Sequence, residues 1–302
     1  MEQELNGIFV VDKPENTTSA KVVAVLKKLL KAKKVGHAGT LDPFATGVLI
    51  CCVNQATRLA RFFLTVKKKY DAVLRLGIET DTQDHTGKIV STSNSTEFSK
   101  KEIRAAVKNF VGRIEQFPPV YSALKHKGVP LYKFARAGKP IQKPARSIHI
   151  SAIRVVDVRL PDIRMEISCS AGTYIRTLCA DIGRVLGCGG HLTRLRRTEC
   201  GRFSAADALT LPDIENLAAS GKLSLHLIEM AEALKDMPAV TAEAGLIEKI
   251  RKGIILSRKD LNPGKDLTVE GYIKVVDQNQ NLISVLDVNP GHERFKYCCV
   301  FS

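Results

Sequence analysis

One eleven-residue segment, His37 to Gly47, constrains this chain more than any other feature of its sequence. It reads HAGTLDPFATG and joins a lysine-rich amphipathic segment to the apolar run Val48 to Val53. Glycines allow positive φ and close approach to a ligand, so the segment predicts a loop that presents Asp42 at a surface. An Asp-Pro pair is equally typical of a helix start, with Asp as N-cap and Pro at the first helical position. The residues alone leave both interpretations open.

Apolar periodicity around this segment predicts a chain in which helices and strands are mixed. An amphipathic helix is expected over 20–32, and strands are expected over 8–11, 48–53, 69–76, 148–160 and 164–168. A helical pattern that runs to Val185 places Arg176 in a first helical turn. The helix dipole favours anions at that end, so a carboxylate or a phosphate is expected to hold this arginine. Residues 191–197 place three arginines around Leu195, and we expect them to form a basic edge.

Residues 118–147 differ in composition from the rest of the chain. They contain seven Lys or Arg, no acid, and the interleaved aromatics Tyr121, Tyr132 and Phe134. Basic and aromatic side chains together are typical of a flexible nucleic-acid-binding segment. An inert connection of roughly thirty residues would be unusually long, which favours a functional segment over a solvated loop.

The charge balance indicates the class of partner. The 302 residues include 46 Lys and Arg against 31 Asp and Glu, a formal net charge of +15, which favours a polyanion. The acidic start Met1-Glu2-Gln3-Glu4 and the absence of a long apolar run predict a cytoplasmic protein without membrane segments. The eight cysteines form no C-x-x-C pair, so neither disulfides nor zinc are expected. No phosphate-loop or dinucleotide motif occurs, and we expect neither a nucleotide cofactor nor a metal.

Two domains are expected. Residues 207–235 are predicted to form a helical connection that closes a first domain, 1–235. Residues 236–302 contain a helical pattern followed by strand-like runs, which is typical of a small, mostly β appendage.

Six motifs in order resemble the TruB family of RNA pseudouridine synthases. They are Asn6-Gly7-Ile8 to Lys13-Pro14, His37 to Gly47, Lys69-Tyr70, Pro118 to Lys125, Gly172-Thr173-Tyr174-Ile175-Arg176 and Leu195-Arg196-Arg197. The resemblance spans residues 6 to about 203. It implies an α+β pseudouridine synthase fold, with a central mixed, mainly antiparallel sheet flanked by helices and loops. The tail, 236–302, resembles the PUA RNA-binding domain.

The resemblance also implies a reaction. It is the isomerisation of one uridine in the T-loop of tRNA, position 55. Apart from the resemblance, we expect a monomer that needs no cofactor. Asp42 is implied as the catalytic carboxylate, acting either as nucleophile at C1′ or as base toward the C2′ proton, and the sequence does not choose between these routes. A stacked uridine must first be flipped into a pocket, at a cost of a few kcal/mol.

The remaining roles are carried over from the same resemblance. Arg176 is implied as the partner of Asp42, and Tyr70 as the aromatic residue that stacks on the base and assists proton movement. The residues implied to contact the flipped nucleotide are His37, Tyr70, Tyr174 and Leu195. Residues 118–147 match the family's RNA-gripping insertion, in which we expect RNA contacts from Lys125, Lys133, Arg136, Lys143 and Arg146.

Two other functions remain open at this stage. The chain could be a non-catalytic RNA-binding or tRNA-folding protein in which Asp42 only caps a turn. It could also be the catalytic subunit of a guide-RNA-dependent pseudouridylation complex that uses the same chemistry.

Overall fold

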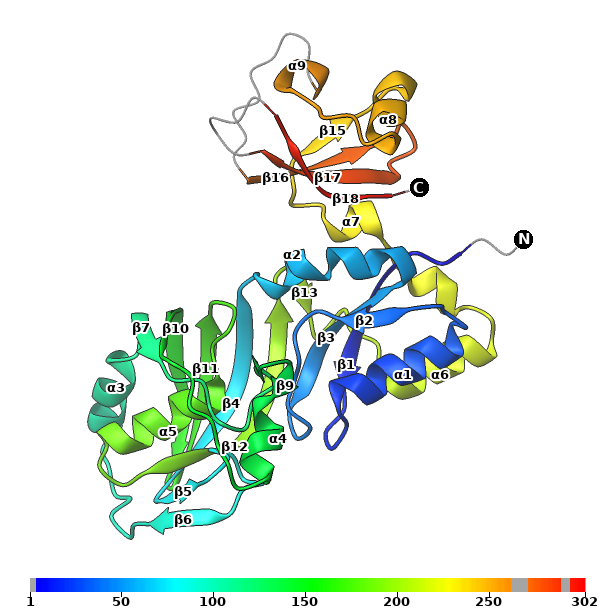
Figure 1. Cartoon of the computed structure of the whole chain (residues 1–302). Helices are drawn as coiled ribbons and strands as arrows, with labels where there is room; N and C mark the ends of the chain where they lie inside the picture. Colours follow the sequence, from blue (N-terminus) through cyan, green and yellow to red (C-terminus); the bar gives the residue numbers. More distant parts are fainter. Residues whose placement is uncertain (1–3, 262–270, 289–293, 302) are drawn as a thin grey trace.

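The structure is a computed structural model that describes residues 4–261, 271–288 and 294–301. A large sheet forms the body of the molecule (Figure 1). Its strands are β1 (Gly7–Lys13), β2 (Val35–His37), β3 (Thr46–Val53), β4 (Lys68–Leu76), β7 (Gly112–Gln116), β10 (Arg146–Arg159), β11 (Asp162–Cys169), β12 (Gly190–Cys200), β13 (Phe203–Ser204) and β14 (Ile228–Glu229). Around it lie α1 (Ser19–Leu29), η1 (Asn54–Leu59), α2 (Ala60–Leu64), α3 (Lys100–Lys108), α5 (Ile175–Val185), α6 (Leu211–Ala219), η2 (Leu223–His226) and α7 (Met230–Ala233).

The strand order is β14-β1-β3-β12-β4-β11-β10-β7, with β2 paired to β3 and β13 to β12. All of these pairings are antiparallel except β12 with β3, which is parallel and short. The sheet is therefore mixed and mainly antiparallel, as predicted. The short parallel contact, at Arg196↔Thr46 and Arg197↔Gly47, joins two halves of the sheet. The Asp42 segment enters β3 at this junction.

One half of the sheet is buried on both faces. Alternate residues of β1 and β3 enter different clusters, so Ile8 and Val10 pack toward η1 and α2, while Phe9 and Val11 pack toward α1 and α6. Cys51 and Cys52 belong to these two clusters, one on each side, and burial raises the pKa of both thiols. These two cysteines therefore act as small apolar core residues.

The other half carries α3 and α5 on one face. Apolar side chains of β4, β11 and β10 form a single cluster with Leu178 and Ile182 of α5 and Ile103 of α3. A capping box at Ser99 and Glu102 opens α3, as its sequence predicts. Between β4 and α3 the chain forms a small hairpin, β5 (Ile78–Thr80) with β6 (Ile89–Thr92).

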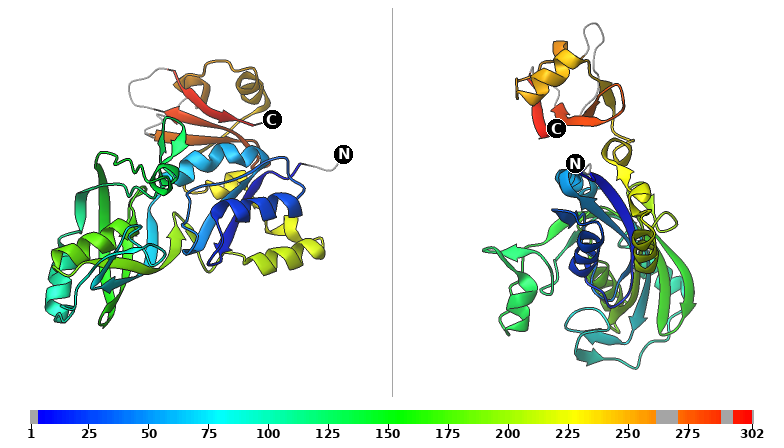
Figure 2. Two further views of the ribbon diagram at one scale, coloured as in Figure 1. Left: turned by 60° about the horizontal axis from the view of Figure 1, so that its bottom comes forward. Right: turned by 90° about the vertical axis from the view of Figure 1, so that its right-hand side faces the viewer.

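Residues 118–147 form an arm over the sheet. It contains the two-residue strands β8 (Lys125–His126) and β9 (Val129–Pro130), followed by α4 (Leu131–Arg136). The right-hand view of Figure 2 shows the arm standing away from the body formed by the large sheet. Leu131 is nonetheless fully buried, so apolar packing anchors the arm.

A second sheet forms the C-terminal part. Its order is β15 (Ala239–Thr241), β16 (Gly271–Val276), β17 (Leu282–Val288) and β18 (Lys296–Val300), and α8 (Ala244–Arg251) and α9 (Arg258–Leu261) accompany it. Lys274 bridges to the body, because its Nζ donates to the carbonyls of Ala231 and Leu234 at 2.9 and 3.0 Å. Every strand of this sheet lies after residue 236, but the division at 235/236 and the PUA-like assignment stay predictions.

Two sequence-based expectations need correction. The first helix ends at Leu29 instead of residue 32, since Leu30 caps it and Lys31 adopts a φ of 49°. Residues 191–197 do not form an edge, because they lie in β12 between β3 and β4. Arg197 can be buried there because backbone carbonyls accept its hydrogen bonds.

Candidate active site

The Asp42 segment is a loop held by three distant side chains. Ser19 Oγ donates to Leu41 O at 3.1 Å and accepts from Leu41 N at 3.0 Å. Lys13 Nζ donates to Pro43 O at 3.0 Å, and Arg197 donates to Gly39 O and Val48 O at 3.1 and 2.7 Å. Asp42 O accepts from Ala45 N, and a turn follows. No helix begins there, so the N-cap interpretation of Asp42 is wrong.

Arg176 forms ion pairs with two carboxylates. Its Nε lies 2.9 Å from Asp42 Oδ2, and its Nη1 lies 3.4 Å from Asp84 Oδ2. The guanidinium also donates to Thr82 O at 2.8 Å and to Tyr121 O at 2.9 Å. The Arg176 side chain is 5% exposed and that of Asp42 is 35% exposed, so the carboxylate is the member of the pair that faces open space. The expectation that an anion holds Arg176 is confirmed.

Opposing effects act on the pKa of Asp42. Burial raises it, the neighbouring Arg176 lowers it, Asp84 raises it, and the more distant Lys13 lowers it, with a net result above the ordinary value. Burial penalises the charged form of a carboxyl group, whereas a neighbouring cation favours it. Arg176 therefore offsets part of the desolvation of a carboxylate placed at a cavity wall.

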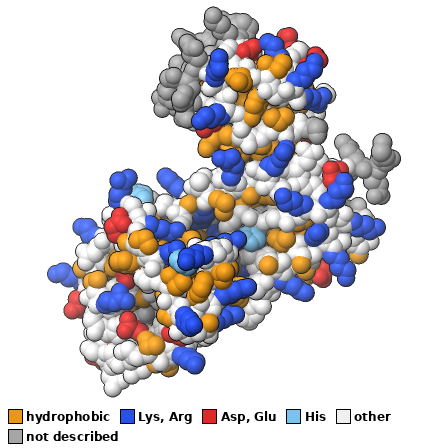
Figure 3. Space-filling model, viewed as in Figure 1, with side chains coloured by type: hydrophobic (Ala, Val, Ile, Leu, Met, Phe, Trp, Pro, Cys, Tyr) orange, Lys and Arg blue, Asp and Glu red, His pale blue; other side chains and the backbone are white. Residues whose placement is uncertain are grey.

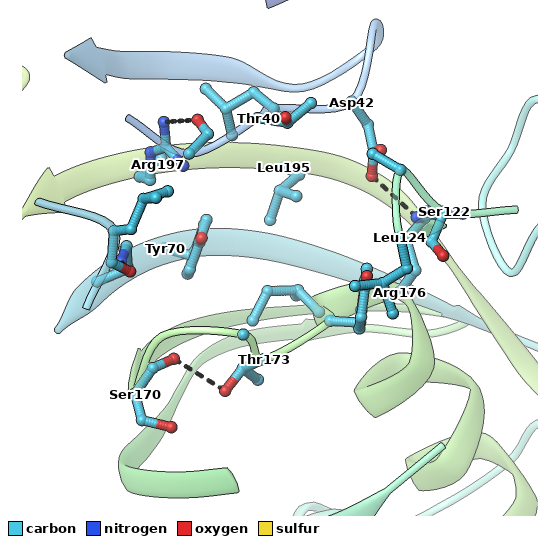
Figure 4. Close-up of a pocket in the computed structure, with 18 of the residues that line it drawn as sticks. Thr40, Asp42, Tyr70, Ser122, Leu124, Ser170, Thr173, Arg176, Leu195 and Arg197 are labelled. Carbon is cyan, nitrogen blue, oxygen red and sulfur yellow. Dashed lines mark hydrogen bonds and ion pairs between the residues drawn. The ribbon is translucent and has the colours of Figure 1, made fainter. Parts of the chain in front are cut away.

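A cavity of about 360 Å³ opens beside Asp42 (Figure 4), and we call it the main cavity. Five predicted site residues line it together with Arg146: Asp42, Tyr70, Tyr174, Arg176 and Leu195. Tyr70 comes from β4, Leu195 from β12, and Tyr174 and Arg176 from the start of α5. Three segments far apart in sequence thus converge on one concave site of a size typical for small-molecule recognition.

Tyr70 lies on the wall of the main cavity and is 9% exposed. Burial raises the pKa of its hydroxyl to about 12, although Arg197 opposes the shift. The hydroxyl therefore stays protonated near neutral pH. The ring provides an apolar surface on which a base can stack.

Tyr174 is fixed through its backbone and its ring. The buried Gln116 side chain donates to Tyr174 O at 3.0 Å and accepts from Tyr174 N at 2.8 Å. The Arg146 guanidinium lies 4.9 Å from the centroid of the Tyr174 ring and donates to Gly172 O at 2.6 Å. Arg146 was predicted as a residue of the RNA-gripping insertion, and the structure places it inside the cavity wall.

His37 does not line the main cavity. It lines a second cavity of about 470 Å³, which also borders Asp42 and Arg176 and which Tyr121, Tyr132 and Arg136 help to form. Burial lowers the pKa of His37, and Arg197 lowers it further. Asp42 thus lies between two cavities, and His37 belongs to the second.

The other predicted RNA-binding residues of the arm are turned toward its surface. Lys125 and Lys133 are exposed and line neither cavity, and Lys143 Nζ lies 3.3 Å from His126 Nδ1. Arg136, which borders the second cavity, is also exposed and lies over the Tyr132 ring at 5.4 Å from its centroid. Figure 3 shows many Lys and Arg side chains and few Asp and Glu on the face that carries the arm.

Sequence analysis missed several residues that build the site. They are Lys13, Lys68, Asp84, Gln116 and Arg197, all of which are 6% exposed or less. Buried charged residues are rare without partners. The partners of Asp84, Gln116 and Arg197 lie tens of residues away in sequence, so only the fold identifies them. Lys68 instead donates to nearby carbonyls. For Asp84 the available signal was its place in the acidic turn-rich segment 80–87.

Within the described residues, no group of three or more His, Cys, Asp or Glu is placed to hold a metal ion. In the same part of the chain, no helix is long and apolar enough to cross a membrane.

Comparison with known sequences places the chain in a family. Residues 27–175 match the TruB family pseudouridylate synthase (N terminal domain), and residues 176–237 match the tRNA pseudouridylate synthase B C-terminal domain. The tRNA pseudouridine synthase B of Geobacter sulfurreducens is 42% identical over 260 residues, which cover 86% of either chain. That of Burkholderia mallei is 38% identical over 287 residues, covering 95% of this chain and 94% of the relative.

Solved structures share the fold. A chain in a Cbf5-Nop10-Gar1 complex aligns with a TM-score of 0.75 at 24% identity, covering 99% of this chain and 84% of that chain. A chain in an H/ACA RNP bound to a substrate RNA containing 2′-deoxyuridine aligns with a TM-score of 0.71 at 25% identity. The alignment covers 94% of this chain and 78% of that chain.

Proposed function

Because the chain belongs to the TruB family of pseudouridine synthases, we propose that it isomerises one uridine in the T-loop of tRNA, at position 55. It is a tRNA pseudouridine synthase, an isomerase. The target position and the roles of individual residues belong to the proposal.

The observation that carries the proposal is the Asp42–Arg176 pair at the wall of the main cavity. A uridine inside a folded loop cannot be attacked while it is stacked, so it must be flipped into a pocket. The main cavity offers the Tyr70 ring and the apolar side chain of Leu195 for the base. Asp42 then faces the ribose, where the bond between C1′ and N1 breaks.

Each site residue has a part in this proposal. Asp42 attacks C1′ or removes the C2′ proton, and Arg176 keeps its carboxylate ionised and oriented. Tyr70 stacks on the base and acts as a neutral phenol, while Tyr174 and Leu195 bracket it. His37, on the second cavity, contacts RNA beside the flipped nucleotide.

The arm supplies phosphate contacts from its cations, Lys125, Lys133, Arg136 and Lys143, and Arg146 links the arm to the cavity. Neutralising phosphates with Lys and Arg contributes affinity that offsets the energy of base flipping. Residues 1–235 form the catalytic domain in this proposal, and 236–302 form a PUA-like RNA-binding domain. The monomer works in the cytoplasm, to which its eight unpaired cysteines are suited.

Tritium release tests the proposal. Conversion to pseudouridine removes the hydrogen at C5, so tRNA transcript labelled with tritium at uridine C5 should release label when the purified chain is added. A transcript with cytidine in place of the uridine at position 55 should release none. Binding without release would instead support an RNA-binding or tRNA-folding protein that performs no chemistry.

The likeness to a chain of the H/ACA RNP favours one second candidate, a catalytic subunit that requires a guide RNA. That chain is 25% identical to this one, whereas the synthase B relatives are 38–44% identical. Turnover of bare tRNA transcript by the chain alone would exclude a requirement for a guide.

A further inference from the structure

Two buried cations line the main cavity away from the Asp42–Arg176 pair. Lys68 is 6% exposed and Arg197 is 2% exposed, and both line the same cavity as Asp42. Neither takes part in any ion pair found between described residues. In Figure 4, Arg197 and Asp42 lie toward opposite ends of the site, with Leu195 between them and Tyr70 below Arg197.

Strand register explains why both cations face the base. Lys68 and Tyr70 are two residues apart on β4, and Leu195 and Arg197 are two apart on β12. Side chains two apart on a strand share a face. Tyr70 pairs directly with Arg197 across the two strands. A base that stacks on Tyr70 therefore lies beside both charges.

The hydrogen bonds of these cations leave their charge unneutralised. Lys68 Nζ donates to Leu64 O and Val66 O, both at 2.7 Å, and Arg197 donates to Gly39 O and Val48 O. Carbonyl dipoles satisfy N–H groups, whereas a carboxylate would also cancel the charge. Arg197 adds to the effect of burial in lowering the pKa of Lys68, so the two cations affect each other. Buried charges without counter-ions are costly, which suggests that an anion forms here during turnover.

The proposed reaction creates such an anion. When the N1–C1′ bond breaks, its electron pair stays on the uracil, whose negative charge spreads over N1, O2 and O4. At the sugar, C1′ bonds to the Asp42 carboxylate, or Asp42 takes the C2′ proton. The base then turns, and C5 bonds to C1′ as the ester bond to Asp42 breaks or as the proton returns to C2′. The C5 proton leaves to solvent, and N1 takes up a proton. The atoms and the charge balance without any co-reactant.

We propose that Lys68 and Arg197 stabilise the uracil anion between cleavage of the N1–C1′ bond and formation of the C5–C1′ bond. Fixed charges aimed at the place where charge develops are worth more in a water-poor site than in water. The inference rests on the proposed function, which assigns uracil to the main cavity.

The test compares two leaving groups. Fluorine at C5 withdraws electrons, so 5-fluorouracil leaves more easily and needs less stabilisation than uracil. Single-turnover rates would be measured on tRNA transcripts made with uridine or with 5-fluorouridine, by loss of the parent nucleoside after digestion. Lys68→Met should slow the uridine reaction by at least about tenfold, since removal of one such donor costs on the order of a hundredfold or more. The same variant should slow the 5-fluorouridine reaction too, but by a factor at least about three times smaller than for uridine. The reason is that the transition state with 5-fluorouracil needs less stabilisation of its charge.

Lys69→Met provides a matched control on the same strand. Lys69 is exposed and pairs with Glu199 at 3.0 Å, outside the cavity. Since an exposed ion pair contributes little, the rates on uridine and on 5-fluorouridine should each change by no more than about twofold. Lys68→Arg, which keeps the charge, should restore most of the uridine rate. If Lys68→Met does not fold by circular dichroism, Lys68→Gln takes its place.

The outcomes separate the two claims. No conversion of uridine tRNA by the unaltered chain would contradict the proposed function itself. Conversion by the unaltered chain, with equal losses on both substrates or no loss in the Lys68 variant, would overturn the inference. A larger loss on uridine than on 5-fluorouridine, at unchanged tRNA affinity, supports it.

Discussion

Nε of Arg176 lies 2.9 Å from Oδ2 of Asp42, and the same guanidinium binds the carbonyl oxygens of Thr82 and Tyr121. One side chain on α5 thus joins the loop before β3, the turn after β5 and the first part of the arm. The carboxylate of Asp42 is oriented by groups from three other parts of the chain. A change that displaces any of these groups is therefore expected to move the Asp42 carboxylate as well.

Replacing Asp42 by Asn should abolish turnover and leave tRNA binding nearly unchanged. The amide occupies the same space beside Arg176 but is neither a nucleophile nor a base at neutral pH. Tritium release and a filter-binding titration would be measured on the same preparation. If affinity falls as far as activity, Asp42 has a structural role in RNA binding instead of a chemical one.

Replacing Asp84 by Asn should change the pH dependence of the reaction. Asp42 must be ionised to act, and burial raises its pKa, so activity should fall with decreasing pH at a higher pH than for an ordinary carboxyl group. Asp84 adds to that rise, and its removal should shift the acid limb of kcat/KM to lower pH. The plateau should drop by about tenfold or more, because Arg176 loses one of its anchors.

The pH profile separates this effect from loss of fold. Asp181→Asn is the matched control, since Asp181 is bound to Arg184 on the outer side of α5 and does not line the main cavity. Its acid limb should coincide with that of the unaltered chain. An acid limb that also stays in place in the Asp84 variant would show that Asp84 does not influence Asp42.

Much of the fold follows from local pattern. The strands β1, β3 and β4 and the helix α5 lie where apolar periodicity predicts them, because their burial is set within each segment. The partner of Arg176 was also expected, since a cation in a first helical turn needs an anion.

The residues that sequence analysis misplaced depend on distant contacts. Three charges in seven residues are typical of a surface segment. In the structure, however, Arg196 pairs with Asp12 at 2.7 Å, and Arg197 donates to the carbonyls of Gly39 in the loop and Val48 in β3. Whether Asp42 caps a helix or begins a turn is decided by Ser19 and Lys13, more than twenty residues away in sequence. Such contacts exist only after folding, so no local pattern encodes them.

Charge removal on the arm should flatten the salt dependence of tRNA binding. Lys125→Gln, Lys133→Gln and Arg136→Gln are combined, since all three side chains are exposed. Removing one cation that binds a phosphate lowers the slope of log K against log salt by roughly one unit. The control removes the same number of charges from α3, by Lys100→Gln, Lys101→Gln and Lys108→Gln. This control should leave the slope unchanged. An unaltered slope in the arm variant would remove the arm from the binding surface.

The glycine at the head of β3 permits the junction on which the site is built. Gly47 has a φ of 101° and pairs with Lys13 of β1 on one side and Arg197 of β12 on the other. A Cβ added to it would lie 2.2 Å from Arg197 O, a backbone atom that cannot move without parting the two strands. Gly47→Ala should therefore lower the free energy of unfolding by roughly 3 kcal/mol. Two causes contribute: the overlap of the added Cβ with Arg197 O, and the strain of a left-handed backbone at a residue with a side chain.

Gly138→Ala separates the two causes of that loss. Gly138 has a φ of 71° but nothing within 4 Å of its added Cβ, so only the backbone strain of about 1–2 kcal/mol applies. Urea unfolding of both variants gives the comparison. Equal losses would mean that the approach of β12 to Gly47 is loose. If the close approach of β12 also positions Arg197 to hold the Asp42 loop, Gly47→Ala should lose more free energy of unfolding than Gly138→Ala, and its turnover should fall.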